Sequence, residues 1–231
     1  MGTLLLVALA SLGLITITTK REREFSFTPP PRSKGGTSSS KERGVVSEQL
    51  QSLYAQALRT MPYAGKTDAA RSGWKTSGMR DKWVKEFYAA VSRVASEKGW
   101  GSHVALFVTA HACWSSGWGR SVMTRLFKNA FGMKAGPGYA GYVIVTSPES
   151  HDTQRTPIHY QVFETYEDCI RAHLALLSVP RYRLSLAKLK AGDMTYGGQL
   201  GADGWYDGQT PEEGNQKWLS YVAQVRSIMA K

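Results

Sequence analysis

The residues that could do chemistry gather in Ala110–Gly119, which reads A-H-A-C-W-S-S-G-W-G. An apolar run precedes this stretch and Gly117 stops it, so we expect a core helix whose last turn opens into a cleft. Ser115 and His111 are four residues apart and would share a helix face. A serine nucleophile with a histidine base is one interpretation. No third, orienting group is evident, however, and a buried structural histidine is the more common situation.

A second motif follows, because Asn129–Lys134 reads N-A-F-G-M-K. Together the two motifs resemble those of the bacterial peptidoglycan N-acetylglucosaminidase family of flagellar and autolysin type, whose signature is A-x-x-E-S-G-W-G followed by N-x-F-G-x-K. The resemblance continues through Tyr160–Thr165, Arg171–His173 and Pro180–Tyr182, and covers the chain from about Ser102 to its end. It implies a lysozyme-like fold that holds peptidoglycan glycan strands and hydrolyses them next to N-acetylglucosamine.

The sequence departs from this family at the decisive position, because Ser115 stands where the family has its catalytic Glu. In the family, a half-desolvated carboxylic acid protonates the glycosidic oxygen. A hydroxyl cannot do so near neutral pH, and loss of a general acid typically costs about 10²–10⁴-fold in rate. The resemblance therefore implies a glycoside hydrolase, whereas Ser115 leaves open a catalytically silent glycan-binding or structural module. Whether Ser115 is natural or a replacement stays open.

Two acidic residues elsewhere in the sequence could act in catalysis although position 115 lacks a carboxylic acid. Glu149 resembles the family's second acidic residue, which would steer water or stabilise the cationic transition state; a solvated turn carboxylate is an equal alternative. Asp152 is weaker, because aspartate at such a place is more often a turn former.

Aromatic and glycine residues in the motifs are the candidates for sugar contacts. Trp118, Phe131 and Gly132 lie inside the two motifs and are predicted to shape the subsites. For Trp118 and Phe131, packing in the core is the alternative. Trp205 and Tyr206 fall where the family places a cleft tyrosine. We expect no metal and no cofactor, because neither the histidines nor the two cysteines have a metal-ligand spacing.

The elements that must position these residues are mostly helical. Apolar residues recur at helical intervals in several segments, which are therefore predicted to be helices. One begins at Ser47, and the others span Asp81–Gly99, Ser102–Gly117, Tyr166–Ser178, Arg183–Lys190 and Pro211–Met229. Two β-rich runs, Tyr142–Thr146 and Ile158–Phe163, predict a hairpin. The fold class is therefore α+β and mainly α, a lysozyme-like domain over residues 47–231. Trp83 and Trp218 are expected in its core.

Residues 1–19 carry no charged side chain and are about long enough to cross a bilayer as a helix. No basic residue precedes the run, and the basic cluster Lys20–Arg23 follows it. This favours a retained membrane anchor over a cleaved signal peptide. The positive-inside tendency puts the domain on the cytoplasmic side, which is the wrong side for a peptidoglycan enzyme in a cell. A virion with its own membrane, or a phage protein exported at lysis, would reconcile the two. Residues 20–46, rich in Pro, Gly and Ser, are predicted to be a flexible linker.

Composition narrows the partners. The net charge of +11 favours a polyanionic partner such as an anionic cell wall. Lys and Arg are scattered without a nucleic-acid-binding motif, so no nucleic acid is expected. Cys113 and Cys169 form either one disulfide or two buried free thiols. We expect the two cysteines to approach each other, because their helices should pack side by side.

Overall fold

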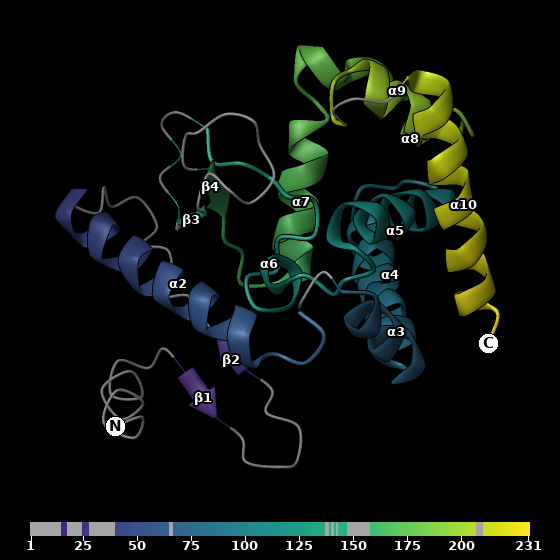
Figure 1. Cartoon of the computed structure of the whole chain (residues 1–231). Helices are drawn as coiled ribbons and strands as arrows, with labels where there is room; N and C mark the ends of the chain where they lie inside the picture. The colour runs from purple at the N-terminus through teal and green to yellow at the C-terminus, as the bar shows by residue number, and fades with distance from the viewer. Residues whose placement is uncertain are drawn as a thin grey trace.

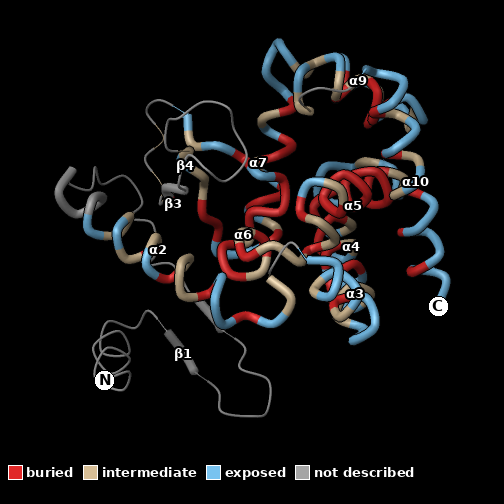
Figure 2. Tube along the Cα trace, in the orientation of Figure 1, coloured by how far each residue is buried: buried red, intermediate tan, exposed pale blue. Residues whose placement is uncertain are grey.

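Helix α5 (His103–Ser116) runs through the centre of the computed structural model and is buried along most of its length (Figure 2). Its sequence is apolar on every side, and a helix that is hydrophobic all round is stable only when it is covered. Helices α4 (Met79–Glu97) and α10 (Pro211–Met229) pack directly against it (Figure 1). The main core therefore forms around α5, and it includes Trp83 and Trp218, as predicted.

The structure describes residues 15–17, 25–27, 40–64, 67–136, 139, 141, 143–146, 158–206 and 210–231. The helix predicted over residues 1–19 is wrong for its described part, because β1 (Ile15–Ile17) is a strand that pairs antiparallel with β2 (Phe25–Phe27). The β-branched sequence Ile-Thr-Ile favours a strand over a helix. Among the residues described, no helix combines the length and the apolar run needed to cross a bilayer.

Helix α2 (Ser40–Thr60) begins earlier than the predicted start at Ser47, within the segment predicted to be a linker. Its buried residues Leu50, Leu53 and Ala57 form a second, smaller core with the short helix α6 (Val122–Arg125) and Ile144. This core explains why α2 is a helix although its first residues are polar: its apolar side is covered by the rest of the domain.

The predicted hairpin is confirmed as β3 (Val143–Thr146) paired antiparallel with β4 (Ile158–Gln161). The register places Ile144 opposite Tyr160. Figure 1 shows the hairpin beside α2, away from α4, α5 and α10, so it forms the small β lobe of a mainly helical domain.

The remaining helices complete the predicted α+β fold. The predicted helices at Tyr166 and Arg183 are confirmed as α7 (Tyr166–Leu176) and α8 (Arg183–Ala191). Sequence periodicity did not predict α3 (Asp68–Thr76), the 3₁₀ helix η2 (Pro180–Tyr182) or α9 (Tyr196–Ala202). At α10, the hydroxyl of Thr210 accepts from the Glu213 N–H while the Glu213 carboxylate accepts from the Thr210 N–H. This capping box fixes the start of α10 where the sequence predicts it.

Cys113 and Cys169 are both free thiols and both buried. The alternative of one disulfide is therefore wrong, and that of two buried free thiols is confirmed. Helix α7, which carries Cys169, packs against α4. Burial raises the pKa of Cys169 to about 12 and the pKa of Cys113 well above its usual range.

We expect neither thiol to react with a disulfide reagent such as Ellman's reagent in the native protein, because the thiolate is the reacting form and both groups are covered. Absorbance should show less than one equivalent of thiol until denaturant is added, and about two afterwards. Rapid native labelling of either cysteine would contradict the buried placement.

Candidate active site

The end of α5 has an unusual backbone. Gly117, Trp118 and Gly119 are consecutive left-handed residues, with φ of 61°, 65° and 73°. The Trp118 N–H donates to the Cys113 carbonyl at 2.7 Å, which closes the helix. A left-handed conformation costs a non-glycine residue roughly 1–2 kcal/mol, and such strain is concentrated at functional sites. The strained tryptophan marks this turn as a candidate site.

Several contacts hold the turn in place. The Ser116 hydroxyl donates to the Ala112 carbonyl at 2.6 Å and accepts from the Gly119 N–H at 2.7 Å. The Trp74 indole N–H donates to the Trp118 carbonyl at 2.9 Å. A Cβ at Gly119 would overlap the Trp83 ring. The S-G-W-G part of the motif is therefore a built turn, in which the serine and the second glycine serve the backbone.

Ser115 lies in the last turn of α5, and its side chain is exposed. His111 is fully buried, and neither of its ring nitrogens has a hydrogen-bond partner in the described structure. The alternative of a serine–histidine dyad is therefore wrong. The half-buried setting expected at position 115 is also wrong for the free protein, because the helix presents this residue outward.

A column of half-buried aromatic rings runs from this turn to α10. Tyr206 stacks on Trp114 with ring centroids 3.7 Å apart, Trp114 on Tyr221 at 6.2 Å, and Tyr221 on Trp118 at 4.9 Å. The Arg80 guanidinium lies 5.5 Å from the Trp118 ring centroid. The Trp118 ring therefore contacts both Tyr221 and a cation, and the column links the α5 terminus to Tyr206.

A cation also lies on the other tryptophan of this column, since the Lys217 ammonium is 5.1 Å from the Trp114 ring centroid. With Arg80 it places positive charge at two points along the column. That charge suits an anionic polymer better than a neutral one.

Two buried histidines lie behind the column. His111 and His173 have ring centroids 4.9 Å apart, and neither side chain is exposed. Burial lowers the pKa of His173 to about 3, and burial together with the nearby His173 lowers the pKa of His111 well below its usual value. Both imidazoles are therefore neutral in the folded protein over the ordinary pH range.

The predicted subsite residues divide between surface and core. Phe131 is only 3% exposed and stacks on His173 at 3.9 Å, so the structure places it in the core behind the site. Gly132 is exposed, with a φ of 64°. Trp205 is half-buried, and its ring centroid lies 4.9 Å from that of His111 and 5.0 Å from that of His173. Substrate contact by Trp118, Gly132, Trp205 and Tyr206 stays a prediction.

The asparagine of the second motif has a structural role. The Asn129 amide nitrogen donates to the carbonyls of Met133 and Gln161 at 3.0 and 2.9 Å, and its oxygen accepts from the Met133 N–H at 2.9 Å. It therefore ties the N-A-F-G-M-K loop to β4. Glu149 and Asp152 lie outside the described residues.

Sequence analysis included Trp114 and His173 in family motifs without assigning them a role, and it did not identify Tyr221 or Arg80. For His173 a signal exists, because it lies on the apolar stripe of α7 with Tyr166, Cys169 and Ile170, where a polar side chain needs a reason.

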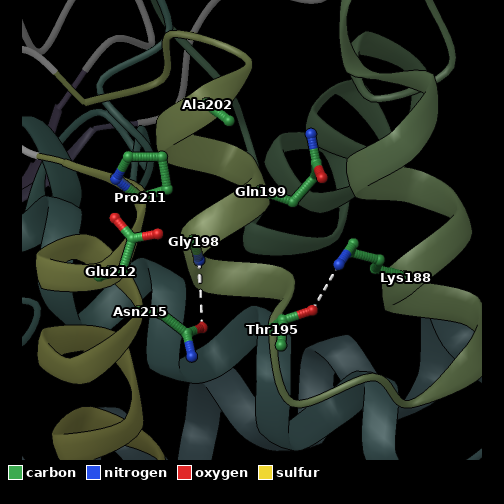
Figure 3. Close-up of a pocket in the computed structure, with 8 residues that line it drawn as sticks. All are labelled: Lys188, Thr195, Gly198, Gln199, Ala202, Pro211, Glu212 and Asn215. Carbon is green, nitrogen blue, oxygen red and sulfur yellow. Dashed lines mark hydrogen bonds between the residues drawn. The ribbon is translucent and has the colours of Figure 1, made fainter.

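A pocket of about 240 Å³ lies elsewhere, between α8, α9 and the start of α10 (Figure 3). Its wall includes Lys188, which donates to the Thr195 hydroxyl at 2.5 Å, and Asn215, whose side-chain oxygen accepts from the Gly198 N–H at 3.1 Å. It contains none of the predicted site residues. In the part of the chain that the structure describes, no cluster of three or more His, Cys, Asp or Glu could hold a metal ion.

Comparison with known proteins links this geometry to a family. Residues 90–231 match the glucosaminidase family model, described as mannosyl-glycoprotein endo-beta-N-acetylglucosaminidase. Among solved structures, a peptidoglycan hydrolase from Sphingomonas sp. A1 is 18% identical with a TM-score of 0.52, and the match covers 65% of this chain and 93% of that one. A peptidoglycan hydrolase mutant from the same organism is 22% identical with a TM-score of 0.50, covering 65% and 98%. No curated protein matches the sequence.

Proposed function

Because this chain belongs to the glucosaminidase family, which its residues 90–231 match, we propose that it acts on peptidoglycan glycan strands at the bond next to N-acetylglucosamine. The fold that it shares with peptidoglycan hydrolases from Sphingomonas sp. A1 supports this substrate. The net charge of +11 supports it as well, since cell walls are anionic.

The observation that carries the proposal is the end of α5, where Ser115 is exposed and Trp118, three residues later, has a strained backbone. A carboxylic acid at position 115 would project from a rigid helix toward solvent, where a glycosidic oxygen can reach it. The turn is built by hydrogen bonds that do not involve Ser115. These hydrogen bonds support the proposal that this turn is the scaffold of the family's acid, with a hydroxyl in the place of that acid.

One specific observation, the hydroxyl at position 115, favours a second candidate function: a glycan-binding or structural module that does not cleave. Zymography on purified cell walls tests hydrolysis, and a pull-down on sacculi tests binding. A cleared zone supports the hydrolase. Binding without clearing supports the silent module, and neither binding nor clearing would contradict both.

We further propose that residues 1–19 stay on the mature protein and attach it to a membrane at the cell wall, in a phage virion membrane if the protein is phage-borne. The support is the lack of charge in this segment and the basic cluster after it. The full chain should sediment with membranes in alkaline carbonate, and N-terminal sequencing should begin before Lys20.

A matched pair of variants sharpens this test. Leu6→Lys together with Leu12→Lys puts two charges inside the apolar run and should release the protein, because each charge is costly in hydrocarbon. Thr18→Lys together with Thr19→Lys adds the same charge next to the basic flank and should leave the protein on the membrane. A wild-type protein that is soluble without detergent would contradict the attachment.

A further inference from the structure

His111 and three side chains around it have buried polar atoms without a hydrogen-bond partner in the described structure. These atoms are both ring nitrogens of His111 and of His173, and the hydroxyls of Tyr196 and Tyr206. The rings of His173, Tyr206 and Tyr196 lie 4.9, 5.7 and 6.4 Å from that of His111. The four residues come from α5, α7, α9 and the segment after α9, so distant parts of the chain converge here.

Such a concentration is unusual, because nearly all buried polar groups in native proteins are hydrogen-bonded to protein or to ordered water. A neutral imidazole has one N–H donor and one nitrogen acceptor, and a phenol can both donate and accept. The partner of this cluster must therefore supply donors and acceptors together.

A metal ion does not meet this requirement. It would bind the imidazole lone pairs but leave their N–H groups unpaired. No third His, Cys, Asp or Glu in the described residues joins the two histidines to form a metal cluster. A buried divalent ion without a carboxylate or thiolate nearby would also lack the charge that compensates it. Water donates and accepts, and it is the usual partner of buried polar groups.

We propose that ordered water molecules bridge His111, His173, Tyr196 and Tyr206, and that this hydrated hub positions Trp205 and Tyr206 for glycan. Trp205 contacts both imidazoles, and Tyr206 stacks on Trp114 of α5. The hub therefore connects the segment after α9 to α5, which carries Ser115 in its last turn. His111 and His173 are positioning residues; the part of the proposal that concerns glycan rests on the proposed function.

Removing single hydroxyls tests the water. Tyr206→Phe and Tyr196→Phe keep each ring, so in a hydrated hub each should lower the Tm of the full chain by about 2–4 °C. Their double variant should deviate from additivity, because the two hydroxyls share partners. In a dry cluster the hydroxyls are unpaired, and the same variants should leave the Tm unchanged or raise it, which would overturn the proposal.

Two controls calibrate this measurement. Tyr166→Phe removes a hydroxyl that accepts from Trp83 at 3.0 Å and donates to the Thr124 carbonyl at 3.2 Å, so a loss is expected. Tyr88→Phe removes a hydroxyl from a half-buried ring of α4 outside the hub, so no change is expected. For the histidines, His173→Gln can keep bonds to water whereas His173→Phe cannot. If the hub is hydrated, His173→Phe should have a lower Tm than His173→Gln. If the cluster is dry, His173→Phe should have the higher Tm.

Binding to purified sacculi tests the positioning. Tyr206→Phe and His173→Phe should weaken binding by about 5- to 10-fold, His173→Gln should restore most of it, and Tyr88→Phe should bind like the wild type. If the variants lose stability but bind normally, the positioning role is wrong. If the wild type itself binds no sacculi, the proposed function fails, while the thermal result still decides whether the hub holds water.

Discussion

Ser115→Glu should raise the rate of cell-wall lysis by at least about 10²-fold, the lower end of what a general acid supplies. The turn that would position the acid is already formed by Ser116, Trp74 and Gly119. If position 115 is the place of the family's acid, as proposed, the substitution supplies the missing proton donor. The decrease in turbidity of purified sacculi, measured at equal concentrations of wild type and variant, gives the ratio directly.

Ser115→Gln is the matched control, because it has the size and polarity of Glu without an acidic proton. It should lyse no faster than the wild type. Position 115 is exposed, so the new carboxyl should titrate near the ordinary value for Glu, about 4.3, until glycan covers it. Lysis by Ser115→Glu should therefore increase as the pH falls from 7 toward 5.

The opposite result has a definite meaning. If the wild type lyses walls at a rate that Ser115→Glu does not improve, Ser115 is not the place of a lost acid. Catalysis would then depend on another group, and Glu149 is the first residue to replace.

Helices whose pattern is strong along the sequence could be predicted with nearly correct ends. Helix α5 is one case, because an apolar run bounded by Ser102 and Gly117 has few alternatives. Helix α9 is the contrary case. Its sequence, Tyr-Gly-Gly-Gln-Leu-Gly-Ala, has poor helix propensity. A Cβ at Gly197 would clash with the Trp218 side chain, so the glycine allows α9 to pack closely against α10. This packing stabilises the helix, and the sequence alone does not reveal it.

The residues of the candidate site likewise include some that the sequence could predict and others that it could not. Ser115 and Trp118 could be identified because their motif is continuous in the sequence. The convergence of His111, His173 and Trp205 could not, because it depends on the packing of α5, α7 and the segment after α9. Phe131 was predicted to shape a subsite because it lies inside a motif, but its ring has a buried partner in His173. Periodicity predicts which face of a helix is apolar, but not which polar side chain that face buries.

The folded protein should lose stability steeply between pH 6.5 and pH 5. Burial lowers the pKa of His173 to about 3 and that of His111 well below its usual value, whereas in the unfolded chain both titrate near 6.5. Above pH 6.5 the two imidazoles are mostly neutral in both the folded and the unfolded state, so they do not make the stability depend on pH. As the pH falls below 6.5, the unfolded state binds protons that the folded state does not, so unfolding becomes more favourable.

Two such histidines give a slope of up to about 2.7 kcal/mol in the free energy of unfolding per pH unit. For a domain of this size the Tm should fall by roughly 5–10 °C per unit, which scanning calorimetry measures. The double variant His111→Gln, His173→Gln should remove most of the slope. His159→Gln, on an exposed residue of β4, is the control and should leave the slope unchanged. The carboxylates of Asp81 and Glu167, whose pKa values are lowered, titrate below this window and do not confuse it. A Tm that stays constant from pH 7 to pH 5 would mean that both imidazoles can be protonated in the folded protein, and the lowered pKa values of the histidine pair would be wrong.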